Sequence, residues 1–332
     1  MEQPREFSGD LSSDPSGPLG ERRGAGLRTG LGAALPIRRS GKWALGGAAA
    51  AVLGAGLAFS PASAEPAGSQ ESAAQEIAGS QEKDVEEAFA KAGLIVDIDA
   101  QTLAFPAGIE VRHDNLEYLL VNPNGAVHES LFVTPVDAFL LATAFLAMGA
   151  EPGTNVVYTA VDPPPTREEV RAGARTHDVE IPQGKPLFLH AAWKEAAGAM
   201  DEATGEFPEQ TVHFHRLEDL VIDLERDRTM RRHGLVWLGS RNVPGKSPGD
   251  AERFAAQATG NLMCVSFFSD GDTLLTTALP ECVSQTAWIP NGWLMPQPGS
   301  EVLLIASAVP LDRVPESLMS ALPLVPEPEP RR

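Results

Sequence analysis

Three consecutive residues, His128, Glu129 and Ser130, are of the types that acid–base and nucleophilic catalysis require. A zinc-protease signature would need a second histidine one helical turn after His128, but position 132 is Phe132. We expect the segment to be a strand, which would place His128 and Ser130 on one face and Glu129 on the other. This arrangement favours hydrogen bonds to neighbouring backbone. A metal-dependent or serine-type hydrolase that uses the His128/Ser130 face is the alternative.

Two further histidines, His213 and His215, would share one face of a strand over Thr211–His215. A metal site would need two more ligands, and no ligand spacing elsewhere in the chain provides them. Asp270 and Asp272 resemble the start of a calcium loop, but the residues that follow are not rich in oxygen ligands. The sequence therefore predicts neither a metal nor a cofactor.

Two other segments carry candidate contacts. Gly239-Ser240-Arg241 lacks the second glycine of a nucleophile elbow, so we expect it to end a strand, with Arg241 pairing an acidic residue nearby. The run WIPNGW, Trp288–Trp293, could stack a sugar, and a loop folded onto the core is the alternative. The candidate ligand contacts are therefore His128, Glu129, Ser130, Arg241 and Trp293, and no catalytic residue is assigned.

The two cysteines, Cys264 and Cys282, lie 18 positions apart. In an exported protein we expect them to form a disulfide, worth about 3 kcal/mol in the chain-entropy model, with free thiols as the alternative. A zinc site built from these two residues alone is excluded, because zinc needs further ligands at short spacing.

Turn-forming residues predict how the strands connect. Asn122-Pro123-Asn124-Gly125 separates the β-rich runs Leu116–Val121 and Ala126–Val133, which we expect to form a β-hairpin. Ser269–Asp272 predicts a second hairpin turn, in which Gly271 has a positive φ. Cys264 and Cys282 would then lie near the open end of that second hairpin.

A very apolar helix is expected over residues 135–148, with Thr134 as its N-cap and Gly149 as its stop. Its composition requires burial on more than one side. The fold class is therefore α+β, a mixed and mostly antiparallel sheet with this helix packed on it. Further strands are predicted at Leu94–Ile98, Leu103–Phe105, Ile109–Arg112, Asn155–Ala160, Pro186–Trp193, Leu235–Leu238, Leu262–Phe268 and Val302–Ser307.

The folded domain is expected to span residues 84–322, between a polar linker over 65–83 and a proline-rich tail over 323–332. It would begin with a short helix, Asp84–Ala92. Inside it, Thr166 and Glu169 form the pattern of a capping box. We interpret Lys194–Glu209 as a loop, and Leu217–Leu224 as a helix with a strand as the alternative.

Four segments resemble the YdjY-like domain of exported bacterial proteins. They are EYLLVNPNGAVHESLFVT at Glu117–Thr134, LVWLGSR at Leu235–Arg241, TGNLMCVSFF at Thr259–Phe268 and WIPN at Trp288–Asn291. Together they span most of the chain after the linker, and GxxHES at Gly125–Ser130 is the most specific element. The resemblance implies location and fold but no reaction, because the family has no established activity. Iron–sulfur binding, which is associated with some relatives, is not carried over because this chain has two cysteines.

Residues 1–64 have the composition of an export signal with a long leader. Arg38, Arg39 and Lys42 precede the apolar stretch Trp43–Phe59, which ends at the small-residue site Ala62-Ser63-Ala64. The residues after the arginine pair are not bulky and apolar, which favours the general secretory route over twin-arginine export. We expect the mature protein in the periplasm or cell envelope, with an uncleaved N-terminal membrane anchor as the alternative.

The first 64 residues hold 7 of the 26 basic and 5 of the 45 acidic groups, so 19 basic and 40 acidic groups remain, a balance of -21. Such a surface repels phosphates, which argues against nucleic acid and against an anionic membrane surface as partners. We therefore expect an exported non-catalytic binding or structural module, whose ligand is unknown and whose partner is an unknown protein or cell-envelope component.

Overall fold

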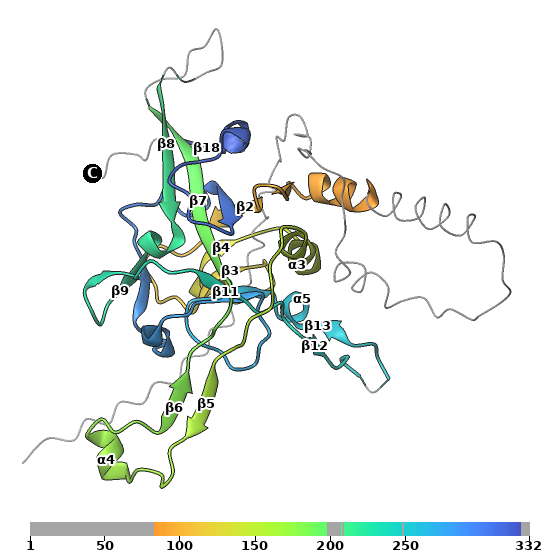
Figure 1. Cartoon of the computed structure of the whole chain (residues 1–332). Helices are drawn as coiled ribbons and strands as arrows, with labels where there is room; N and C mark the ends of the chain where they lie inside the picture. Colours follow the sequence, from red (N-terminus) through yellow and green to blue (C-terminus); the bar gives the residue numbers. More distant parts are fainter. Residues whose placement is uncertain (1–82, 198–206, 208, 248, 327–332) are drawn as a thin grey trace, which may run out of the picture. The chain divides into compact units, whose positions relative to one another are not determined.

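Eight strands of the computed structural model close into a barrel (Figure 1). The structure describes residues 83–197, 207, 209–247 and 249–326. In ring order the strands are β2 (Thr102–Ile109), β17 (Glu301–Ser307), β7 (Pro186–Ala197), β11 (Leu235–Trp237), β15 (Leu275–Thr276), β14 (Asn261–Cys264), β3 (Tyr118–Val121) and β4 (Ser130–Val133). Strand β4 pairs with β2 at Gly108↔Val133 and Ile109↔Phe132, which closes the ring.

The sheet is mixed and mostly antiparallel, as the sequence predicts. Within the ring only β14–β15 and β3–β4 are parallel. Strands β1 (Ile95–Asp97), β8 (Glu209–Arg216) and β18 (Leu324–Pro326) extend the sheet, β1 against β2 and the other two against β7. Three smaller sheets consist of β9 (Val221–Asp223), β10 (Arg228–Thr229) and β16 (Trp288–Pro290); of β12 (Asn242–Val243) and β13 (Arg253–Phe254); and of β5 (Val157–Ala160) and β6 (His177–Glu180).

Strands β2, β17 and β7 are buried on both faces, which explains their nearly continuous apolar sequences. Alternate residues such as Leu103, Phe105 and Leu304 belong to the main core. The residues between them, such as Ala104 and Ile305, pack in a second cluster with Val314, Leu318 and Leu322, from the 3₁₀ helix η4 (Glu316–Ala321) and its flanks. At eight strands a barrel interior is just wide enough for side chains to fill it.

The expected hairpin over Leu116–Val133 is wrong, because β3 and β4 run parallel. The turn itself forms, since the Gly125 N–H donates to the Asn122 carbonyl over 2.9 Å. The chain then passes through the 3₁₀ helix η1 (Val127–Glu129) back to the start of β3 and does not run antiparallel to it. Three hydrogen bonds of Asn122 stabilise this parallel return. Its backbone N–H donates to the Gly260 carbonyl, and its side-chain amide donates to the carbonyls of Thr134 and Val136.

The second expected hairpin is also wrong. Gly271 has the predicted positive φ of 70°, yet β14 and β15 on either side of the turn run parallel. In both cases the sequence predicts the local turn. It does not predict the direction of the strands, because β14 also pairs with β3 and β15 also pairs with β11.

The apolar helix α3 (Ala138–Ala147) is shorter than expected. Asp137 caps it by accepting from the N–H groups of Phe139 and Leu140, whereas the Thr134 hydroxyl donates to the Pro106 carbonyl. Phe139 is 42% exposed, so the helix is not buried on all sides. Gly149 ends it with a φ of 93°, as predicted. The fold is thus mostly β with a few short helices, and it fits an α+β class only broadly.

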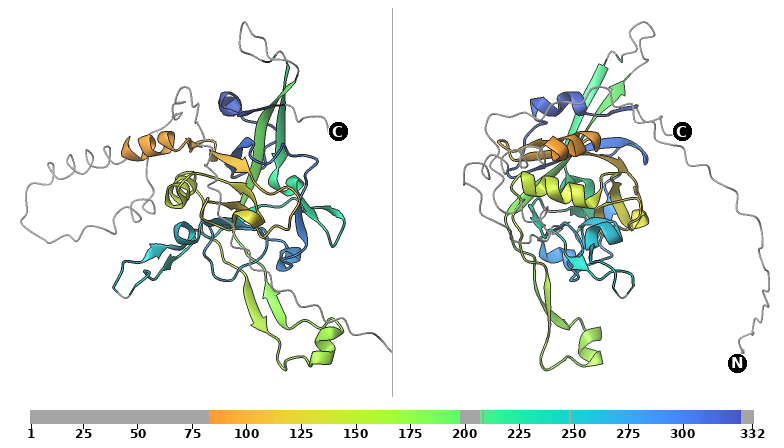
Figure 2. Two further views of the ribbon diagram at one scale, coloured as in Figure 1. Left: turned by 180° about the vertical axis from the view of Figure 1, so that it is seen from behind. Right: turned by 90° about the vertical axis from the view of Figure 1, so that its right-hand side faces the viewer.

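Helix α3 lies against the barrel (Figure 2), and Leu141 and Phe145 are among its residues in the main core. The Phe145 ring lies 6.4 Å from Phe105 of β2 and 5.0 Å from Trp237 of β11, measured between centroids. The short helix α5 (Ala255–Thr259) lies nearby, where Phe139 meets Phe254 edge to face.

One insertion, which we name the arm, comprises residues 157–180 with β5, β6 and the helix α4 (Arg167–Arg171). The predicted capping box at Thr166 and Glu169 is present at the start of α4. Gly153 and Gly184 meet where the arm leaves the barrel: a Cβ on Gly153 would lie 2.4 Å from the Gln183 carbonyl oxygen, and one on Gly184 3.0 Å from the Gly153 Cα. Thr154 and Gln183 form a bridge at this neck.

Several predicted boundaries change. Residues 83–91 are helical, and Gly93 follows with a φ of 73°, as expected for Asp84–Ala92. The interpretation of Lys194–Glu209 as a loop is wrong at its ends, because β7 continues to Ala197 and β8 begins at Glu209. Leu217–Leu224 divides into the 3₁₀ helix η2 (Leu217–Leu220) and β9.

At the termini, the expected tail begins as part of the sheet, since β18 pairs with β7. The export signal and residues 65–82 lie outside the described residues. No helix in the described part of the chain has the length and apolar content needed to cross a membrane.

Replacing Asn122 with Ala should destabilise the parallel return, because two buried carbonyl acceptors would lose their donor. We expect the free energy of unfolding to fall by about 1–3 kcal/mol in urea titrations. Asn124→Ala, at an exposed position of the same turn, is the matched control and should change it by less than about 0.5 kcal/mol. Equal effects of the two variants would show that the Asn122 amide does not hold the return.

Candidate functional site

The segment His128–Ser130 does not present one polar face. His128 lies in η1, its side chain is 79% exposed, and its Nε2 is 3.4 Å from Oε1 of Glu129. Ser130 is fully buried and its hydroxyl donates to the Phe132 carbonyl over 2.9 Å. The expected sharing of a face by His128 and Ser130 is therefore wrong, because a 3₁₀ turn replaces the strand at His128. The expected hydrogen bond from Ser130 to nearby backbone is confirmed.

The parallel register brings a second carboxyl group to Glu129. Tyr118 pairs with Ser130, so the preceding residues, Glu117 and Glu129, are neighbours at the start of the two strands. Burial raises the pKa of Glu117, and the adjacent charge of Glu129 raises it further. The nearest hydroxyl in sequence, that of Ser130, is buried and donates to the Phe132 carbonyl, so it does not face this pair of carboxyl groups. Sequence reasoning missed Glu117 because it assumed an antiparallel pair.

His213 and His215 share a face of β8, as predicted, but they surround an aromatic ring. Trp193 stacks on His213 at 5.1 Å and lies 5.4 Å from His215, while His213 Nε2 is 3.0 Å from Glu195 Oε2. Burial lowers the pKa of His215. Among the described residues no group of three His, Cys, Asp or Glu side chains is placed to hold a metal.

Another histidine, His190, lies on the opposite face of β7, where it is fully buried and stacks on Phe214 at 4.7 Å. Burial lowers the pKa of His190 to about 4, so it is neutral near pH 7. Two barrel strands, β17 and β2, separate β7 from β4. The histidines therefore do not converge with Ser130.

Arg241 pairs with an acidic residue, as predicted. Its Nε is 2.8 Å from Oδ1 of Asp272 and 2.6 Å from the carbonyl of Asp270. The Ser240 hydroxyl donates to the Asp272 carbonyl and accepts from the Ala256 N–H. These contacts hold the end of the strand against the Asp270–Asp272 turn. Both hydrogen bonds of the Ser240 hydroxyl are structural, so we assign Ser240 no role as a nucleophile.

The WIPNGW loop combines a buried and an exposed tryptophan. Trp288 is fully buried and its indole N–H donates to the Ser284 carbonyl, whereas Trp293 is 81% exposed. Asn291 anchors the loop to η2, its N–H donating to the Leu220 carbonyl and its amide to the Asp219 carbonyl. The expected loop folded onto the core is found at Trp288, whereas Trp293 is exposed, and sugar stacking stays a prediction.

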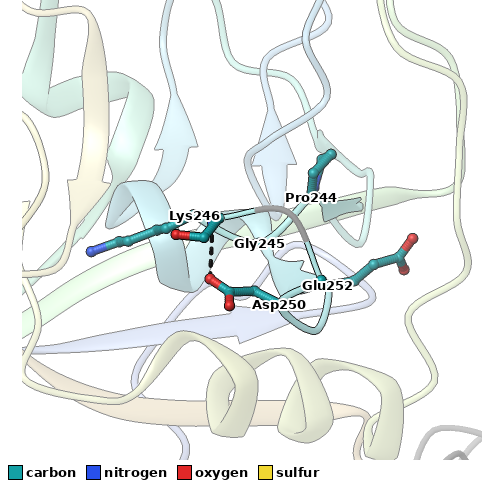
Figure 3. A pocket seen from close by; sticks show the side chains of 7 residues that line it. Pro244, Gly245, Lys246, Asp250 and Glu252 are labelled. Atoms are coloured by element: carbon teal, nitrogen blue, oxygen red, sulfur yellow. Dashed lines mark hydrogen bonds between the residues drawn. The ribbon is translucent and has the colours of Figure 1, made fainter.

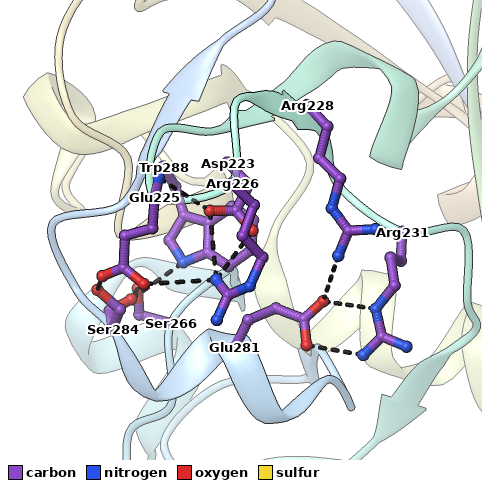
Figure 4. A network of polar contacts seen from close by, with 9 residues as sticks. All are labelled: Asp223, Glu225, Arg226, Arg228, Arg231, Ser266, Glu281, Ser284 and Trp288. Carbon is purple, nitrogen blue, oxygen red and sulfur yellow. Dashed lines mark hydrogen bonds and ion pairs between the residues drawn. The ribbon is translucent and has the colours of Figure 1, made fainter.

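A network of arginines and carboxylates joins β9, β10 and the 3₁₀ helix η3 (Pro280–Val283) (Figure 4). Glu281 is 7% exposed and receives two hydrogen bonds from Arg231, of 2.6 and 2.7 Å, with Arg228 at 3.6 Å. Arg226 bonds Asp223 at 3.0 Å. Sequence reasoning missed this network, although four arginines within residues 226–232 of a strongly acidic chain were a visible signal.

The two cysteines are free and buried, so the expected disulfide is not formed. Cys264 packs with Tyr118 and Val121 in a small cluster, whereas Cys282 belongs to the main core. The Cys264 sulfur lies 3.2 Å from the Thr276 hydroxyl. The two thiols are therefore held in different clusters, and the second hairpin that would have brought them together does not exist.

A hollow at the β12–β13 loop offers no convergent chemistry (Figure 3). It is lined by one loop, within which the Ser247 N–H donates to the Asp250 carboxylate over 2.9 Å. Lys246 and Glu252, which also line it, come from the same loop.

The chain matches no known protein family, no curated protein and no solved structure.

Thiol titration should find no reactive cysteine in the folded protein and two after unfolding without reductant. Burial raises the pKa of Cys264, and raises that of Cys282 to about 12, so neither forms the reactive thiolate near pH 8. Fewer than two thiols in the denatured, unreduced protein would show that a disulfide forms.

Glu281→Gln should change how stability depends on acid. The hydrogen bonds from Arg231 hold the pKa of Glu281 at about 2, below the ordinary 4.5. The pair therefore stabilises the fold above pH 4.5, and its contribution is lost as the pH falls from 4.5 through 2. We expect the variant to lose about 1–3 kcal/mol at pH 7 and to show a flatter decline in acid. Glu252→Gln, at an exposed position, is the control, and identical profiles would contradict the assignment.

Proposed function

We propose that this chain is an exported, non-catalytic binding module that contacts a sugar ring of a cell-envelope component through Trp293. The observation that carries the proposal is an indole 81% exposed on a loop whose backbone is fixed. An exposed aromatic face offers a sugar ring an apolar surface, and a fixed loop keeps the ordering cost of binding low.

The support for the loop comes from three elements. Strand β16 pairs with β9, Asn291 bonds η2, and the Arg112 guanidinium donates through Nε and Nη2 to the Gly292 carbonyl. A Cβ on Gly292 would lie 3.1 Å from Arg112 Nε, so glycine lets the arginine reach the backbone there.

Exposed polar side chains lie on the chain segment that runs beside the loop of Trp293. The Leu116 N–H donates to the Trp288 carbonyl, so the segment before β3 runs beside the loop. His113, Asp114 and Asn115 on this segment are exposed, and they carry the donors and acceptors that sugar hydroxyls require.

The rival function, a hydrolase on the His128/Ser130 face, has less support. Ser130 is buried, His128 is exposed and paired with Glu129, His213 and His215 surround Trp193, and His190 lies on the far face of β7. A nucleophile, a base and an oxyanion site within hydrogen-bonding reach do not converge among these residues.

The remaining expectations from the sequence stay predictions. Export to the periplasm or cell envelope depends on residues 1–64, and kinship with the YdjY-like family depends on the four segments that resemble it. The balance of -21 supports a partner that is neither nucleic acid nor an anionic membrane surface.

Thermal-shift titration of the full chain with peptidoglycan fragments and simple sugars tests the proposal. We expect a shift in the wild type and in Trp293→Phe, and binding weakened on the order of tenfold in Trp293→Ala through the lost stacking. Val309→Ala, at a position 60% exposed, is the control. A sugar shift that persists in Trp293→Ala, or the absence of any shift in the wild type, would contradict the proposal. So would a stoichiometric metal in the purified protein.

A further inference from the structure

The arm is exposed along its whole length. Strands β5 and β6 pair only with each other, through Val157↔Glu180 to Ala160↔His177 (Figure 1). No residue of the arm is buried, and only Val161, Pro165 and Val179 are partly covered. A two-stranded hairpin with both faces in water is marginally stable alone. The arm also exposes Val157 at 49%, Tyr158 at 37% and Val170 at 41%.

The helix end of the arm presents a basic and apolar face. Arg167, Val170 and Arg171 are spaced at i, i+3 and i+4, so they lie on one side of α4. Glu169 is turned away from this side, because its carboxylate accepts from the Thr166 N–H and hydroxyl. Within the described part of the chain neither arginine makes an ion pair.

The strand end of the arm presents an acidic and apolar face. Val157 lies directly opposite Glu180, and Thr159 opposite Asp178, so these four side chains point to the same side of the hairpin. All four are exposed. Asp178 accepts from Arg175 at 3.0 Å, in a pair whose side chains are 79% and 57% exposed, which leaves carboxylate oxygens available to a further donor.

We propose that two copies of this chain pair arm to arm in antiparallel orientation about a two-fold axis. Arg167 and Arg171 of one copy then contact Asp178 and Glu180 of the other, while Val170 meets Val157. A two-fold axis repeats each contact, so a single complementary pair of faces is used twice. One arm carries both a basic face and an acidic face, so the basic face of one copy can meet the acidic face of an identical copy. The proposal is independent of the contact at Trp293.

The net charge of the protein does not prevent this association. Two full chains, each with a formal charge of -19, repel, but charges farther apart than about 8 Å are screened at an ionic strength of about 0.15 M. Ion pairs at the arm act within about 4 Å and are screened less. Salt near physiological strength therefore weakens the long-range repulsion more than the contacts at the arm.

Charge reversal tests the pairing by complementation. One variant carries Arg167→Glu and Arg171→Glu, and the other carries Asp178→Lys and Glu180→Lys. In either variant alone, both faces of the arm have the same charge, so self-association should fail. In an equimolar mixture each reversed face meets an opposite one, so a heterodimer should form.

Sedimentation equilibrium of the full chain from about 1 µM to 1 mM, near 0.15 M salt, measures the association. We expect the wild type to dimerise, each variant to associate at least tenfold more weakly, and the mixture to recover dimerisation. Lys246→Glu with Arg313→Glu makes the same change in net charge as Arg167→Glu with Arg171→Glu, at exposed positions outside the arm, and should dimerise like the wild type. Circular dichroism confirms that each variant is folded.

Three results would overturn the proposal. They are a wild type that stays monomeric over the whole range, a mixture that fails to recover association, and a control variant that dissociates as much as the arm variants do. The last would assign the association to net charge and not to the arm.

Discussion

The pairing of β4 with β2 is the constraint on which the rest of this molecule depends. Two residue pairs turn an open sheet into a ring, and a ring has no exposed edge among its eight strands. The closure requires β4 to lie between β3 and β2, which the chain achieves by returning in parallel through η1. Asn122 stabilises that return from inside, because its buried amide occupies two carbonyls that would otherwise lack donors.

The closed ring also explains where chemistry is found and where it is not. Polar residues on barrel strands, such as Ser130 and His190, are buried by the side chains packed on the two faces of the sheet. Charged and aromatic groups accessible to partners lie instead on insertions between barrel strands. The Arg231–Glu281 pair joins two insertions, the segment after β10 and the helix η3. The Glu281 carboxylate is buried, so it is not available to a partner.

Local signals in the sequence were sufficient for elements but not for their partners. The capping box at Thr166 and the stop at Gly149 depend on residues close in sequence, and they are confirmed. The expected acidic partner of Arg241 is found in Asp272, which lies 31 positions away. The turn after Asn122 also forms, yet the strand that follows pairs in parallel, because Gly260 and the β2 edge decide its neighbours. Glu117 beside Glu129 follows from that register, and the separation of the two cysteines follows from the parallel pairing of β14 with β15. Neither could be predicted from the sequence.

The neck at Gly153 and Gly184 has a consequence for the modularity of the chain. The two strands of the insertion leave the barrel as paired backbones, about 5 Å apart at Thr154 and Gln183, and the Val236 side chain lies against Gly153 and Gly184. Because the two backbones are adjacent at the neck, a short linker in place of the arm could join them at little entropic cost. The 24 residues of the arm can therefore change in length or sequence without altering the register of the ring of strands.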